Sequence, residues 1–243
     1  AAHYGADTVS LAVVGDVDAT RVLAALERRL GKLERTGQGP LAIAPGPPRD
    51  APAREVVFVP EKASVDVLMG TPGTLRRTDP AYYPALLGNF TLGGSASARL
   101  FQTVRDQLGL TYGVSTTLEA AHGPGPWVLS MTLNPSNVEP ALEAARRVAE
   151  EVRAKGITPE ELAAAQDTLT GRFQVGLATN AGMAAALASF ESYGFPPDFI
   201  DRHPRLIRAV TSEQVREVLQ RVLHPATALT VIAGSYPPPA TPR

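Results

Sequence analysis

Apolar, β-branched residues open the chain in a short run at residues 8–14, which predicts a strand. Asp18 is a residue type favoured at helix N-caps and Gly31 one favoured at helix ends, so a helix is expected between them. Its apolar stripe consists of Val22, Leu23, Leu26 and Leu30. Because one strand and one helix cannot bury their own apolar faces, we expect residues 1–35 to be the closing strand and helix of a truncated upstream domain.

The composition changes at residues 36–54. This segment contains Pro40, Pro45, Pro47, Pro48 and Pro52, interspersed with Gly37, Gly39 and Gly46. Because proline stiffens a chain and glycine interrupts regular elements, we expect a semi-rigid linker here. The following domain then spans residues 55–236 and leaves a proline-rich tail at residues 237–243.

The larger domain begins with strands expected at residues 55–60 and 65–70. Asp79, with Pro80 after it, should open a helix that ends at the pair Gly93-Gly94. Ser95 or Ser97 should cap the next helix, and the glycine pair would let the two helices meet at a tight corner.

The second of these helices has an apolar face made of Leu100, Phe101, Val104 and Leu108. Gly109 is well placed to end it, and Tyr112 would open a strand. Residues 111–118 and 127–133 are expected to form neighbouring antiparallel strands around a turn rich in glycine and proline.

Helical spacing then continues from Val138 to Gly156. Capping boxes at residues 158–161 and 211–214 each indicate the start of a further helix, and residues 228–233 predict a final strand closed by Gly234. Groups of strands separated by helices predict an α+β fold, a mainly antiparallel mixed sheet with helices packed on one face. The final strand also echoes residues 11–15, as two successive copies of one domain type would.

The amino-acid composition excludes several classes of function. Hydrophobic residues make up 44% of the 243 residues, which is ordinary for a globular domain, and 23 basic residues nearly balance 24 acidic ones. No run of Lys and Arg with interleaved aromatics is present, so no nucleic-acid partner is expected. No apolar run approaches the roughly 20 residues of a transmembrane segment. The absence of cysteine excludes disulfides but fits a cytoplasmic or a periplasmic location equally, so the compartment stays open.

The four histidines stand apart and none belongs to an H-x-x-E-H or H-E-x-x-H pattern: His3, His122, His203 and His224. Glu119 and His122 are three residues apart, but they lie at an expected hairpin end, where that spacing does not bring their side chains together. Asp16 and Asp18 are better explained by helix capping than by metal binding. We therefore expect no metal, no cofactor and no catalytic residue in this chain.

One motif carries a specific resemblance. It runs from Gly93-Gly94-Ser95 through Arg99-Leu100-Phe101 and Arg105 to Gly109-Leu110 and Tyr112. This stretch resembles the signature of the second, zinc-free half of the pitrilysin and mitochondrial processing peptidase family. In that family the other half carries H-x-x-E-H, and the zinc-free half offers an arginine and a tyrosine seven positions apart to the peptide. Arg105 and Tyr112 have that spacing.

The resemblance implies a processing-peptidase-like metallohydrolase domain, the substrate-binding half of a zinc metalloendopeptidase. Arg105 and Tyr112 would bind the peptide substrate, while zinc would belong to an H-x-x-E-H half, fused or separate, and this chain alone would be inactive. An arginine fork and a phenol can hydrogen-bond substrate carbonyls near the scissile bond. Taken singly, Arg105 could be a solvated cation and Tyr112 a half-buried strand aromatic. The alternative function is a non-catalytic assembly or peptide-holding scaffold of the same family.

Overall fold

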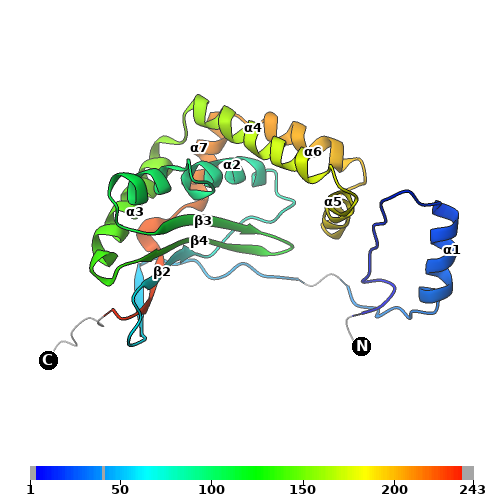
Figure 1. Ribbon diagram of the computed structural model, residues 1–243, viewed down its shortest axis with the longest axis horizontal. Coiled ribbons are helices and arrows are strands. Elements are labelled where there is room, and N and C mark those ends of the chain that lie inside the picture. Colours follow the sequence, from blue (N-terminus) through cyan, green and yellow to red (C-terminus); the bar gives the residue numbers. More distant parts are fainter. Residues whose placement is uncertain (1–3, 40–41, 237–243) are drawn as a thin grey trace. The chain divides into compact units, whose positions relative to one another are not determined.

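The computed structural model describes residues 4–39 and 42–236, and the chain forms two compact units (Figure 1). One unit combines the described residues up to 42 with residues 169–205. The other combines residues 43–168 with the described residues from 206 onward. The domain boundaries predicted at residues 35, 54 and 236 stay predictions, and the tail at 237–243 lies outside the described residues.

The second unit contains a five-stranded sheet in the order β1-β5-β2-β4-β3. β1 and β5 are parallel, and the other neighbours are antiparallel, which confirms the predicted mixed, mainly antiparallel sheet. The strands are β1 (Ala53–Phe58), β2 (Val65–Thr71), β3 (Gly113–Ala120), β4 (Pro124–Leu133) and β5 (Leu229–Gly234). Every strand expected in residues 55–236 is therefore present, with ends displaced by a few residues.

Helices cover one face of this sheet (Figure 1). The side chains of Val65, Val67 and Met69 on β2 point to that face and are 0% exposed, whereas Leu68 between them is 47% exposed. This alternation follows from the period of two in a strand that is buried on one side only. The covering helices are α2 (Tyr82–Gly93), α3 (Val138–Lys155) and α7 (Ser212–Val222).

Local signals set the helix ends. Thr158 and Glu161 exchange side-chain and backbone hydrogen bonds of 3.2 and 2.7 Å at the start of α4 (Pro159–Gly176). Thr211 and Gln214 do the same before α7, so both predicted capping boxes are confirmed. Asp79 stands outside α2, which begins at Tyr82, and the Asp79 side chain accepts from the backbone N–H of Arg76. No helix in the described part of the chain is long and apolar enough to cross a membrane.

The first unit contains α1 (Ala19–Leu30), α5 (Asn180–Ser192) and parts of α4 and α6 (Phe199–Arg208). Aromatic rings join the last three helices: Phe173 lies 4.5 Å from His203, and Phe190 lies 5.0 Å from Phe199, between ring centroids. His203 is only 7% exposed among these rings. These aromatic residues therefore pack against one another and form the interior of this unit.

The expected strand at residues 8–14 is wrong for this structure. Residues 9–14 belong to no strand or helix, and Val9, Leu11 and Val13 are 41, 58 and 53% exposed. A strand is stable only when neighbours satisfy its backbone groups, and the described residues place none beside it. β5, which it echoes, lies between β1 and β2. The helix predicted next is confirmed, since Asp18 caps α1 and Gly31 ends it.

Helix α2 approaches strand β3 closely. Asn89 on α2 donates to the backbone carbonyl of Thr116 on β3 at 3.2 Å and accepts from the indole of Trp127 on β4 at 3.1 Å. Gly93 makes this approach possible, since a Cβ at that position would lie 2.5 Å from Thr116 Oγ1 and 2.8 Å from Thr116 N. The glycine pair therefore serves a helix–strand contact as well as the helix end, where Gly94 donates to Phe90.

We predict that Gly93→Ala destabilises the protein by about 1–3 kcal/mol, because the added methyl group would overlap rigid backbone of β3. Gly171→Ala is the matched control. It lies inside α4, where no described heavy atom comes within 4 Å of the added Cβ, so it should leave stability unchanged or raise it by up to about 1 kcal/mol. Urea unfolding measures both; equal effects would contradict the close approach.

Candidate functional site

The two residues singled out by the sequence, Arg105 and Tyr112, lie beside each other in the second unit. Arg105 belongs to a π-helical segment, η1 (Phe101–Gln107), in which the N–H of Leu108 reaches the carbonyl of Thr103 at 3.1 Å. Gly109 then adopts a φ of +62° and donates to the Arg105 carbonyl, which turns the chain back toward β3. Tyr112 stands directly before β3, and its N–H donates to Thr132 of β4 at 2.9 Å.

Three contacts hold the Arg105 guanidinium. Its Nε donates to the backbone carbonyl of Tyr112 at 3.1 Å, and its Nη1 donates to Asp106 at 3.0 Å. Its central carbon lies 4.6 Å from the centroid of the Phe101 ring, within cation–π distance. The structure therefore joins Arg105 to the main chain of Tyr112, a contact that sequence spacing alone does not specify.

Both side chains remain accessible. The Arg105 side chain is 44% exposed, and Tyr112 is 66% exposed. Within the described residues, neither Nη2 of Arg105 nor the hydroxyl of Tyr112 has a hydrogen-bond partner. An exposed tyrosine of this kind at the start of an otherwise well-packed strand leaves its hydroxyl free to bind another molecule.

The loop between the two residues is fixed by hydrogen bonds. The Thr111 hydroxyl lies 2.8 Å from the carbonyl oxygens of Gly113 and Thr132, and its single proton can be donated to either. The Asn137 side chain donates to the carbonyl of Leu110 at 3.2 Å. Tyr112 is therefore presented from an ordered backbone, as precise recognition of a ligand requires.

An ion pair anchors the residues that precede η1. Arg99 donates from Nε and Nη2 to the two carboxylate oxygens of Glu161 at 2.7 and 2.6 Å. Burial by itself would raise the pKa of Glu161, but hydrogen bonds from Arg99 and from the N–H of Thr158 outweigh it and lower that pKa below its ordinary value. Glu161 thus completes the capping box of α4 and fixes the start of the Arg105 segment.

Sequence reasoning singled out Arg105 and Tyr112 as candidates and correctly predicted the capping box that contains Glu161, but it missed two neighbours of these residues. The ring of Phe101 under Arg105 was assigned only to an apolar helix face, although its spacing of four residues from Arg105 allows contact. The partner of Glu161, Arg99, lies far away in sequence, and no local pattern indicates that pair.

Within the described part of the chain, the residue types that bind metals do not cluster. Among residues 4–39 and 42–236, no group of three or more His, Asp or Glu side chains could hold a metal ion. His203 is packed among phenylalanine rings, and His224 contacts the Arg221 carbonyl at 2.9 Å; His3 lies outside the described residues. These donors do not fit a catalytic zinc site.

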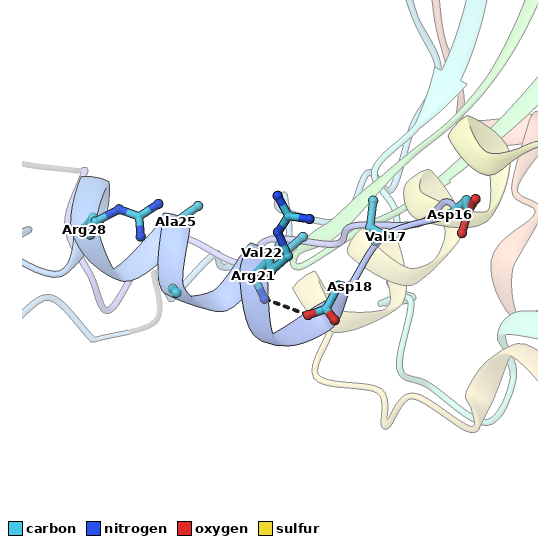
Figure 2. A pocket seen from close by; sticks show the side chains of 8 residues that line it. Asp16, Val17, Asp18, Arg21, Val22, Ala25 and Arg28 are labelled. Carbon is cyan, nitrogen blue, oxygen red and sulfur yellow. Dashed lines mark hydrogen bonds between the residues drawn. The ribbon is translucent and has the colours of Figure 1, made fainter.

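A hollow of about 540 Å³ lies in the first unit, at the start of α1. Figure 2 shows Asp16 and Asp18 in its lining, together with Arg21 and Arg28. The Asp18 carboxylate accepts from the N–H of Arg21 at 2.9 Å, so its capping role is confirmed. Because charges of both signs line this open surface, it has no evident selectivity for one ligand.

Comparison with known proteins identifies relatives. Residues 1–169 match the family described as the peptidase M16 inactive domain. The chain is 30% identical over 235 residues to an uncharacterized zinc protease of Streptomyces coelicolor, covering 95% of this chain and 51% of that protein. It is 36% identical over 129 residues to the chloroplastic stromal processing peptidase of Pisum sativum, covering 52% of this chain and 10% of that protein.

A solved structure agrees with these relatives. The crystal structure of a peptidase M16 inactive domain from Pseudomonas fluorescens superimposes with a TM-score of 0.80 at 26% identity, covering 90% of this chain and 52% of that one. The α+β fold predicted from the sequence is thereby confirmed. The chain spans about half the length of the Streptomyces relative.

We predict that Glu161→Gln lowers the free energy of unfolding at pH 7 by about 1 kcal/mol, because glutamine can keep the capping hydrogen bond but loses the charge-assisted pair with Arg99. Since the folded-state pKa of Glu161 is lowered, its stabilisation is present above the ordinary value of 4.5 and is lost as the pH falls through the folded-state value. The difference from wild type should therefore shrink in acid.

Urea unfolding at several pH values measures this difference. Glu143→Gln is the control, because Glu143 is exposed on α3 and has no ion pair among the described residues. A loss for Glu161→Gln that stays constant down to pH 2 would show that the ion pair is not its cause.

Proposed function

This chain belongs to the peptidase M16 inactive domain family, and on that premise we propose that it is the zinc-free, substrate-binding half of a zinc-dependent metalloendopeptidase. The observation that carries the proposal is the joined pair of Arg105 and Tyr112, with free donors on exposed side chains. The family supplies the reaction class, and these two residues supply a way to hold a peptide.

The pair is suited to main-chain carbonyl groups. Nη2 of Arg105 and the hydroxyl of Tyr112 are both hydrogen-bond donors, and carbonyl oxygens are the acceptors that every peptide bond offers. Contacts to the backbone set the position of a peptide without reading its side chains. Held next to the scissile bond, the same donors would also stabilise negative charge that develops on a carbonyl oxygen during hydrolysis.

Zinc would be supplied by a partner half that bears H-x-x-E-H, fused or separate. Two facts about one relative support this division: the Streptomyces protein is named a zinc protease, and this chain aligns to only about half of it. The described donors of this chain do not form a zinc site, so its own part is to bind and position the peptide. By itself it should be inert.

The N-terminal residues offer a contact surface for that partner half. Leu11 and Val13, in the segment before α1, are more than half exposed, and Leu23 on α1 is 66% exposed. No residue of α1 is buried. We propose that residues 1–35 complete the partner's sheet and core, because exposed apolar groups that echo β5 would gain strand neighbours and burial there.

We predict that mixing this chain with its zinc-binding half restores chelator-sensitive cleavage of quenched fluorescent peptides. Arg105→Ala and Tyr112→Phe should each lower the rate about 100- to 1000-fold, the usual loss when a positioned donor at a developing charge is removed. Arg105→Lys should also fail to restore the rate, because it keeps the charge but loses the fork.

Gln102→Ala, an exposed change on the same turn, is the matched control and should cleave like wild type. Size-exclusion chromatography checks that each variant still assembles. Assembly without cleavage by the wild type would replace the peptidase with the scaffold alternative. Full peptide cleavage by this chain alone would contradict the proposal that zinc belongs to the partner.

A separate prediction concerns residues 9–14. Their backbone amides should exchange with deuterium rapidly in the isolated chain and become protected when the zinc-binding half is added, because strand pairing protects amide hydrogens. The amides of β5 serve as an internal reference, since they are paired in the chain itself. Unchanged exchange at residues 9–14 in an assembled complex would rule out their role as a strand of the partner.

A further inference from the structure

The Phe101 ring occupies a defined place under the Arg105 guanidinium. The flanking residues Leu100 and Val104 are 0% exposed, so this helical segment is held against the core. Phe101 is half-buried between that core and solvent, and its ring centroid lies 4.6 Å from the central carbon of Arg105. Buried neighbours on both sides thus hold the backbone from which the ring projects.

The contacts of Arg105 use different parts of the guanidinium. Phe101 covers one face, the Tyr112 carbonyl accepts from Nε, and Asp106 accepts from Nη1. Nη2 is left for an outside acceptor. Two hydrogen bonds in the guanidinium plane and one ring against its face together restrict a side chain whose rotamers would otherwise be free.

We propose that Phe101 is a positioning residue for Arg105: its ring holds the guanidinium so that Nη2 is directed to a substrate main-chain carbonyl. This inference rests on the proposed function. An arginine ordered before binding loses less conformational entropy when the peptide arrives, so the ring acts on peptide binding through Arg105 and does not touch the substrate.

The first test uses this chain alone and does not depend on peptide cleavage. The Arg105 Nε–H is assigned by NMR through its loss in Arg105→Lys, and its order parameter and solvent exchange are compared in wild type, Phe101→Leu and Phe101→Tyr. We expect a lower order parameter and faster exchange in Phe101→Leu, and wild-type values in Phe101→Tyr, which keeps a ring. Phe101→Met is a second variant without a ring, in case Phe101→Leu folds poorly.

The second test uses the chain assembled with its zinc-binding half. Phe101→Leu should lower kcat/KM for a neutral peptide about two- to fivefold, the range expected for loss of an exposed cation–π contact. Phe101→Tyr should restore it, and Gln102→Ala should not change it. In the Arg105→Lys background, Phe101→Leu should cause no further loss, because the group that it positions is already gone.

The outcomes separate this inference from the proposed function. An Arg105 Nε–H equally ordered in Phe101→Leu overturns the positioning role, whatever the peptidase assay shows. Loss of order with unchanged kcat/KM in an active assembly also overturns it, because the order would then not serve the substrate. A third outcome is that Arg105 loses order in Phe101→Leu while the wild-type assembly cuts no peptide. That result supports the positioning of Arg105 by Phe101 and contradicts the proposed peptidase function.

Discussion

The close contact between helix α2 and strand β3 is the constraint on which the candidate site depends. Asn89 satisfies the Thr116 carbonyl and the Trp127 indole in the buried interior, and Gly93 removes the Cβ that would push the two elements apart. α2 leads toward η1 and Tyr112 leads into β3, so this contact fixes the two elements that flank the site, while the Gly109 turn and the Arg105–Tyr112 hydrogen bond set the separation of the two residues. An unsatisfied polar group here would cost more than the hydrogen bonds contribute, so the arrangement is strongly specified.

Local sequence signals predicted much of the fold, since they act within a few residues. The capping residues Asp18, Thr158 and Thr211 were read correctly because a side chain and a nearby N–H suffice to begin a helix. The strand at residues 8–14 failed for the opposite reason, since a strand depends on neighbours that its own sequence does not contain. The parallel pairing of β1 with β5 likewise joins distant segments, which alternation of apolar residues cannot reveal.

In the candidate site, too, some features could be predicted from local sequence and others depended on the tertiary structure. Arg105 and Tyr112 were found through a motif with a fixed spacing, but their environment was not. A π-helical turn needs one residue more per turn than the α-helical pattern used to interpret the sequence, and packing decides where it occurs. The Arg99–Glu161 pair joins two helical segments through tertiary structure alone. Motif spacing thus singled out the two residues proposed to bind the peptide, while their side-chain contacts required the fold.

The place of β5 in the sheet has a consequence for how the protein is made. β5 is the last strand in the sequence, yet it lies between β1 and β2, which have no direct pairing with each other. During synthesis the ribosome therefore releases β1 long before β5, its strand neighbour among the described residues, exists, and β1 must wait with its backbone groups hydrated or held by a chaperone. Pairing across so large a sequence separation is slow. A ribosome stall shortly before β5 would leave a chain with most of its helices, a three-stranded sheet and an unprotected edge open to aggregation.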